Sequence, residues 1–549
     1  ETALIFNNAS SDFNGQIQIG NGTVILGATA ALGTNTSTSA RGVDLGLNVG
    51  DTSMTNNVSL LASNGVTVGQ SIYVSTSVNG GVTNTRTIGL SGNGTNTYNN
   101  QFYLDGALTV NVGTAATDRV NLTANITNTG SLIKTGSGFL SLSASNSYTG
   151  GTTIALGSTE GILIGHDNAF GTGGVTNNAN GGTFQSDTTR TVANNFRLDN
   201  NTLFTGSGSL TINGTLSISA SPDLTNNLTG GLTLNNVTMG SSGTSRTLSL
   251  RGTGTTTING VIANAGGQTT NNLVIGTGGG TNSTTILNGN NTYTGATTIN
   301  SGAIVRLGNA NGLGSTAAPT SISSLGGALD LNGQTGVGES ISGGGTGVSS
   351  SGMIFNSSAS AASLTGTVTL SANTTIGVTN GAITLSGAIS ESGGVRSLTK
   401  SGTGSLTLSG ANSFSGGFSF GAGTVVIGND AALGTGAADF STDVTLNSDS
   451  SARTITNAIT FRNLTVGGTG ALTLSGTNTH TASSNTLTNN NSGGLTLGAL
   501  NLSGTATGRT MTVAGTGNTV FSGTIANGPS ATTGGLTINS SGTTTSVSY

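Results

Sequence analysis

The chain of 549 residues contains 94 glycines, three prolines and no cysteine, and charged residues make up only 6% of it. The formal net charge of −4 is small for this length, so neither a nucleic acid nor an anionic membrane is an expected partner. Short alternating runs of Val, Ile, Leu and Thr argue against disorder, and the scarcity of proline excludes collagen. No apolar run approaches the length of a membrane span, so we expect no membrane insertion by this segment.

Short strands joined by tight turns are the predicted elements throughout the chain. Residues 405–409, Ser-Leu-Thr-Leu-Ser, are typical, because apolar and polar residues alternate before a Gly-Ala-Asn turn. No stretch of ten or more residues has apolar residues at helical spacing, and glycine interrupts every candidate. We therefore predict an all-β fold, a right-handed parallel β-helix (β-solenoid) that forms an elongated rod. Coils of about 20–25 residues would stack Val, Ile and Leu inside, with Gly and Asn at the corners.

The composition does not change along the chain, which predicts a single continuous solenoid over residues 1–549. One motif recurs along it. A partial copy at residues 13–33 comes first, full copies follow at 132–171, 273–314 and 398–434, and residues 525–549 begin another. The spacing of the copies predicts a period of roughly 120–145 residues that contains several coils. The recurring positions are an upstream isoleucine, an aromatic residue and a glycine two residues later: Ile126, Ile262, Ile389 and Ile525; Tyr148, Tyr293 and Phe414; Gly150, Gly295 and Gly416.

Few residues have the chemistry of an active site. The nearest approach to an acid–base pair is His166 beside Asp167, but the third full copy has Asn429 and Asp430 there. We therefore expect a turn in which the aspartates accept hydrogen bonds from backbone amides. The recurring aromatic residues are able to stack on sugars, but Phe414 lacks the tyrosine hydroxyl, which favours a structural role in the core.

We predict no catalytic, cofactor-binding or metal-binding residue and no enzyme activity. A polysaccharide lyase or hydrolase is the least favoured alternative, because the acids rarely fall close together in sequence. A calcium-binding nonapeptide array is excluded by the pattern, whereas an isolated calcium ion at an aspartate-containing corner is left open.

The three full copies resemble a known repeat. Leu-Thr-Lys-Ser-Gly-Thr-Gly-Ser-Leu-Thr-Leu-Ser-Gly from Leu398 to Gly410, with Asn-Ser-Phe-Ser-Gly-Gly after it, is similar to the autotransporter-associated β-strand repeat. This repeat is also called the passenger-associated transport repeat. Residues 132–171 match nearly as well and share the lysine, Lys134. The resemblance implies a secreted bacterial β-helix at the cell surface, where such passengers serve as stalks, adhesins or aggregation factors.

Both ends of the sequence read as strands that lie inside the period of the repeat. We expect Leu4, Ile5 and Phe6 at one end, and Val547 and Tyr549 at the other, to contact a further coil. If that coil belongs to another subunit, end-to-end stacking or strand exchange gives a homopolymer. An excerpt from a longer chain would read the same way.

The favoured function is therefore a structural, fibre-forming shaft that is extracellular or on the bacterial cell surface. The alternative is an adhesin or autotransporter passenger that attaches to a carbohydrate or host surface, or that aggregates cells. The segment from Thr34 to Tyr103 matches the repeat poorly, and such a departure favours the adhesin.

Overall fold

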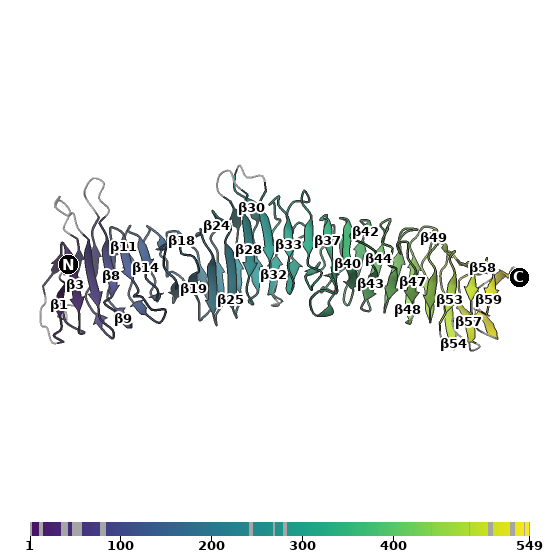
Figure 1. Cartoon of the computed structure of the whole chain (residues 1–549), viewed down its shortest axis with the longest axis horizontal. Helices are drawn as coiled ribbons and strands as arrows, with labels where there is room; N and C mark the ends of the chain where they lie inside the picture. Colours follow the sequence, from purple (N-terminus) through teal and green to yellow (C-terminus); the bar gives the residue numbers. More distant parts are fainter. Residues whose placement is uncertain are drawn as a thin grey trace. The chain divides into compact units, whose positions relative to one another are not determined.

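The computed structural model describes residues 3–9, 15–33, 42–46, 57–76, 84–240, 245–266, 270–277, 283–440, 442–481, 484–502, 509–527, 533–542 and 544–547. The chain divides into two compact units, Glu1–Leu273 and Val274–Tyr549. Each unit is a β-solenoid, a stack of parallel strands, which confirms the predicted all-β solenoid fold (Figure 1). The described residues contain no α-helix, only the 3-10 turn η1 (Val348–Ser350), and none of their helical segments is long and apolar enough to cross a membrane.

The first unit contains four parallel ladders, here called A to D. Ladder A consists of β1 (Leu4–Phe6), β3 (Gly22–Leu26), β5 (Val58–Ala62), β8 (Arg86–Leu90), β11 (Leu108–Asn111), β14 (Leu132–Thr135), β16 (Thr152–Ile154), β18 (Val175–Asn177), β21 (Phe196–Leu198), β24 (Leu216–Ile218), β27 (Val237–Met239) and β30 (Ile262–Asn264). Ladder B consists of β2 (Ile17–Ile19), β4 (Val43–Leu45), β7 (Ile72–Val74), β10 (Phe102–Leu104) and β13 (Ile126–Thr127). Ladder C consists of β6 (Thr67–Val68), β9 (Thr95–Tyr98), β12 (Arg119–Leu122), β15 (Phe139–Leu142), β17 (Ile162–Ile164), β19 (Gly182–Gln185), β22 (Thr202–Gly206), β25 (Asp223–Leu228) and β28 (Thr247–Arg251). Ladder D consists of β20 (Arg190–Val192), β23 (Leu210–Ile212), β26 (Leu232–Leu234) and β29 (Thr256–Ile258), and the division between the units falls within β31 (Asn272–Ile275).

The second unit contains four further ladders, E to H. Ladder E consists of β32 (Ser283–Leu287), β34 (Ala303–Leu307), β36 (Ala328–Asp330), β38 (Ile354–Phe355), the second half of β40 (Val368–Gly377), β43 (Leu398–Ser401), β45 (Phe418–Phe420), β47 (Ala438–Phe440), β50 (Ile459–Phe461), β53 (Asn478–His480), β56 (Leu500–Asn501) and β59 (Ile525–Ala526). Ladder F consists of β33 (Thr297–Ile299), β35 (Thr320–Ile322), β37 (Ile341–Gly345), the first half of β40 and β42 (Ile389–Glu391). Ladder G consists of β39 (Ala362–Leu364), β41 (Ile383–Leu385), β44 (Ser405–Leu408), β46 (Thr424–Ile427), β48 (Val444–Ser448), β51 (Leu464–Gly467), β54 (Ser484–Asn489), β57 (Arg509–Gly515) and β60 (Gly534–Ser540). Ladder H consists of β49 (Arg453–Ile455), β52 (Leu472–Leu474), β55 (Leu495–Leu497), β58 (Thr519–Phe521) and β61 (Thr544–Val547).

The core is built from strands of three residues, in which the first and third side chains point into the solenoid and the middle one points outwards. In ladder D, Leu210 and Ile212 are fully buried, whereas Thr211 between them lies half-buried on the outside. The next coil places Leu232 under Leu210 and Thr233 under Thr211, about 20 residues later in the chain. Each buried leucine or isoleucine contributes roughly 1.5–3 kcal/mol relative to an exposed one. This burial fixes the register between coils, because a slip by one residue would turn the buried leucine and isoleucine side chains of the strand outwards.

Candidate functional site

The repeated motif occupies two strands and then a segment without a strand. In the first full copy, β14 and β15 form two sides of a coil, and Asn146 lies on the third side, 5% exposed. Its Oδ1 accepts a hydrogen bond from the N–H of Ile126 at 2.9 Å, and its Nδ2 donates to the carbonyl of Ala169 at 2.7 Å. Ile126 precedes Asn146 by 20 residues and Ala169 follows it by 23, so one amide joins three successive coils.

The same asparagine recurs in the other full copies. Asn412 accepts from Ile389 N–H at 2.8 Å and donates to the Ala432 carbonyl at 2.6 Å. In the second copy Asn291 donates to the Gly312 carbonyl at 2.6 Å. A side-chain amide thus replaces the backbone pairing that a strand would supply on this side, because buried backbone groups need partners.

The recurring aromatic residues fill the core beside these asparagines. Tyr148, Tyr293 and Phe414 are all fully buried, so none of the rings has a surface on which a sugar could stack. The hydroxyl of Tyr148 shares a hydrogen bond with Thr152 Oγ1 at 2.5 Å, and Tyr293 does so with Thr297 at the same distance. Burial raises the pKa of both tyrosines. The third copy has Phe418 where the others have this threonine, so both hydroxyls are absent together.

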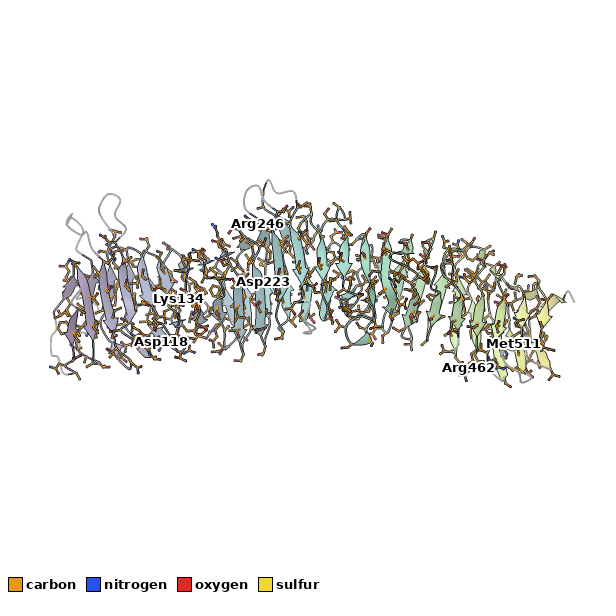
Figure 2. All side chains as sticks on the ribbon, viewed as in Figure 1. Asp118, Lys134, Asp223, Arg246, Arg462 and Met511 are labelled. Carbon is orange, nitrogen blue, oxygen red and sulfur yellow. The ribbon has the colours of Figure 1, made fainter. Side chains whose placement is uncertain are left out.

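The two lysines of the chain, Lys134 and Lys400, are also inside the core. Lys134 is fully buried, and its Nζ donates to the carbonyls of Gly136 at 2.7 Å and Glu160 at 2.8 Å (Lys134 is labelled in Figure 2). Burial lowers the pKa of Lys134 to about 8, and the nearby charge of Glu160 opposes this change. Both ammonium groups are therefore held by backbone carbonyls, and neither is available to a ligand.

Lys400 repeats this arrangement in the third full copy. It is fully buried, and its Nζ donates to the carbonyls of Gly402 at 2.7 Å and Ala422 at 2.6 Å. The same Nζ lies 5.3 Å from the centroid of the Phe420 ring, which faces the cation favourably. Burial lowers the pKa of Lys400 to about 8. The second copy has Ile275 at this position, so the ammonium group is not a requirement of the motif.

The recurring glycines lie where one coil approaches the next. The N–H of Gly416 donates to the Arg396 carbonyl at 2.9 Å, and a Cβ on Gly416 would lie 2.4 Å from the carbonyl carbon of that residue. Gly150 is equivalent, because its Cβ would lie 2.6 Å from the carbonyl carbon of Gly130. Gly295 is buried at the same point of the second copy. Close contact between backbones leaves no room for a side chain.

Gly416→Ala is expected to lower the free energy of unfolding of the second unit by about 2 kcal/mol, because the methyl group must push two backbones apart. Urea denaturation followed by circular dichroism would measure the change. Gly421→Ala is the matched control, since its Cβ would meet only the Lys400 carbonyl at 3.6 Å, an ordinary contact. Equal destabilisation by the two substitutions would contradict the role given to Gly416.

The turn after the motif uses its polar residues locally. His166 Nδ1 accepts from the N–H of Asn168 at 3.0 Å, and Asn429 Oδ1 accepts from Ala431 N–H at the same distance. The histidine thus takes the place of an asparagine in a turn. Asp167 and Asp430 accept from backbone amides of the following coil, those of Thr191 and Thr454, at 3.2 and 3.0 Å. No group of three or more His, Cys, Asp or Glu residues that could hold a metal ion occurs in the described part of the chain.

The remaining predicted positions are divided between core and surface. Ile126, Ile262 and Ile389 begin β13, β30 and β42 and are buried, whereas Ile525 begins β59 and is half-buried. Leu4, Ile5 and Phe6 form β1, which pairs with β3, and are 59%, 55% and 37% exposed. At the other end, β61 pairs with β58 and places Val547 opposite Phe521. Tyr549 lies outside the described residues.

A family model described as the passenger-associated-transport-repeat matches the chain at residues 132–158, 277–305, 398–427 and 464–484. The chain therefore carries this autotransporter passenger repeat at four places, and three of them are the full copies for which the resemblance predicted it. No curated protein and no solved structure was found to match.

The fourth match, at residues 464–484, was missed by the sequence analysis. Its strands β51, β52 and β53 belong to ladders G, H and E, whereas the copy at 398 begins with β43 and β44 on ladders E and G. His480 stands where the other copies have the aromatic residue, and Val466 stands where two of them have lysine. His480 is fully buried, its ring centroid lies 6.1 Å from that of Phe461, and its Nδ1 lies 3.1 Å from the Leu502 carbonyl oxygen. Burial lowers the pKa of His480, so the imidazole is neutral at neutral pH.

Proposed function

We propose that the chain is a structural shaft of an extracellular or cell-surface bacterial protein, with no catalytic role. One observation carries this proposal: the residues that recur in the repeat, the asparagine, the aromatic residue, the lysine and the glycine, all serve coil-to-coil packing. A repeat that bound a ligand through its recurring residues would present them on the surface. The repeat belongs to a family typical of secreted or cell-surface passengers, which supports the location.

We further propose that the shaft lengthens by adding parallel coils to β1 and to the strands β60 and β61. Leu4 and Phe6 continue the columns of the core residues Val24 and Leu26, yet they are 59% and 37% exposed. Ile538 in β60 is also 47% exposed. A further parallel coil would cover this apolar surface and pair with the open edge of β1. A second copy of the chain is the proposed source of that coil.

Light scattering and electron microscopy of residues 1–549 over a wide range of concentration would test the homopolymer. We expect filaments whose length increases with concentration, and we expect Ile5→Pro to shorten them, because proline removes a backbone donor while an edge strand tolerates it. Ile5→Val is the control and should polymerise normally. Single particles at every concentration would reject self-association.

An adhesive function is the second candidate, and it is favoured by the segment that departs from the repeat. Tyr73 in β7 and Tyr103 in β10 lie opposite each other on the outward side of ladder B. Their rings stack with centroids 4.3 Å apart and planes inclined by 12°. Aromatic side chains on the outside of the solenoid are suited to contact a carbohydrate or a host surface. An adhesive function also requires a site on the solenoid that binds the ligand.

A further inference from the structure

The chain contains a buried arginine that is not paired with an acid. Arg86 begins β8 and pairs in register with the core residue Val58, and its side chain is 4% exposed. Its Nη1 donates to the Asn84 carbonyl at 3.3 Å, and its Nε has no acceptor. Within the described residues, no carboxylate forms an ion pair with it. Burial lowers the pKa of the guanidinium, although it remains charged.

Two more exposed arginines of the same unit, Arg197 and Arg251, lie beside carboxylates. Arg197 Nε lies 2.7 Å from Asp199 Oδ1, and Arg251 Nε lies 2.8 Å from Asp223 Oδ1. Both are much more exposed than Arg86, with 57% and 34% of the side chain accessible. A buried cation without a counter-charge is costly to the fold. Arg86 thus has a cost that the exposed arginines avoid.

Arg86 lines a hollow of about 550 Å³ on the first unit. The hollow is open to solvent and lies where ladders A and B meet, within and beside the segment that departs from the repeat. Among the described residues that line it, none is acidic and Arg86 carries the formal charge. Polar atoms come from Asn84, Thr85 and Thr109, and apolar surface comes from Ala107 and Ile133.

We propose that this hollow binds the carboxylate of an acidic saccharide, such as a uronic acid. A guanidinium binds a carboxylate through two parallel hydrogen bonds, and the low dielectric around Arg86 strengthens them. Hydroxyl and amide groups of the wall suit sugar hydroxyls, and the apolar residues suit the C–H face of a sugar ring. The volume accommodates one or two sugar residues. The inference goes beyond the shaft, since ligand binding at Arg86 requires neither polymerisation nor a free chain end.

Saturation-transfer NMR with residues 1–549 would test this site, using glucuronate, glucuronate methyl ester, glucose and inorganic phosphate as probes. We expect glucuronate to bind and the uncharged ester and glucose to bind at least about tenfold more weakly, because they lack the charge that pairs with Arg86. Absence of glucuronate binding, or equal binding of glucose, would overturn the proposal. Phosphate that competes as well as glucuronate would also overturn it, by showing a general anion site.

Substitutions separate Arg86 from the rest of the surface. Arg86→Met should abolish glucuronate binding, and Arg86→Lys should weaken it, because lysine cannot form the two-bond pair. Ile133→Glu gives an independent check that does not disturb a buried position, since Ile133 is on the outer side of β14 and its replacement would repel a carboxylate. Arg197→Met is the matched control and should bind glucuronate as the wild type does. Retention of binding in both Arg86→Met and Ile133→Glu would reject the site.

Discussion

Replacing Asn412 by alanine is expected to lower the free energy of unfolding of the second unit by about 3–5 kcal/mol. The side chain is 3% exposed and satisfies two buried backbone groups, Ile389 N–H and the Ala432 carbonyl, at 2.8 and 2.6 Å. Each group left without a partner costs about 1–3 kcal/mol, and the lost volume adds to this. Urea denaturation of the full chain would measure the loss. Hydrogen exchange at the Ile389 amide would locate it, since that amide should exchange much faster.

Asn380→Ala is the matched control for this prediction. Asn380 is exposed and donates one hydrogen bond, to the Ser357 carbonyl at 2.9 Å, so its loss should change stability by well under 1 kcal/mol. Asn412→Asp gives a further comparison, because the carboxylate keeps the acceptor for Ile389 but lacks the donor for Ala432. We expect it to be at least as destabilising as alanine near neutral pH. A small effect at Asn412, equal to that at Asn380, would contradict the role of the amide.

Glu339 is expected to make the stability of the second unit depend on pH. It lies two residues before β37, the position that Asn194 has before β21 and Asn457 before β50. Both asparagines donate to two carbonyls of the preceding coil, Asn457 to those of Gly434 and Gly436. A carboxylate cannot donate. Glu339 Oε1 accepts from Thr320 Oγ1 at 3.2 Å, whereas Oε2 has no partner and the residue is 3% exposed.

Burial raises the pKa of Glu339 to about 7, whereas the hydrogen bond from Thr320 lowers it. The folded state therefore binds the proton more tightly than the unfolded state, whose pKa is near the model-peptide value of about 4.3. Protonated Glu339 therefore stabilises the folded state. This contribution to the free energy of unfolding is fully present below the unfolded-state pKa of about 4.3 and is lost as the pH rises through 7. Tyr293 is the titratable group near this carboxyl, and it is neutral over the same range. The loss amounts to about 3 kcal/mol at pH 8.

Glu339→Gln is expected to remove this dependence and to raise the free energy of unfolding at pH 8 by about 3 kcal/mol, with little change at pH 4. Urea denaturation at a series of pH values would show it. Glu391→Gln serves as a control of opposite sign, because hydrogen bonds from Ser415 and Arg396 hold the pKa of Glu391 low, so its stabilising effect is lost as the pH falls. A wild-type and a Glu339→Gln profile of the same shape would refute the assignment.

The sequence predicted the strands better than it predicted the polar interior. Residues 405–409 form β44 over Ser405–Leu408, because alternation of apolar and polar residues is a local property that one strand displays by itself. The aromatic positions were found for the same reason, as each copy repeats them. The asparagines beside them also recur in the motif, but the sequence alone did not predict their role. Their function depends on which coil lies above and below, and no local pattern records that.

Arg86 and Glu339 could not be predicted from the sequence at all. Each gains its properties from the register between coils, which places a charged side chain at a buried position. A single repeat gives no signal for such a residue, because the equivalent positions in other coils are apolar or are asparagine. Lys134 and Lys400 did recur, but a lysine in a glycine-rich segment reads as a surface residue. Their burial follows from carbonyls supplied by neighbouring turns.

The copies at 398 and 464 begin on different sides of the same unit, since β43 belongs to ladder E and β51 to ladder G. A gene duplication therefore need not add a whole number of coils to preserve the fold. A strand with its turn is a sufficient insert, because every side accepts the same alternation of inward apolar and outward polar residues. Variation in length among related genes should accordingly occur in steps of one strand, which is a finer increment than the coil.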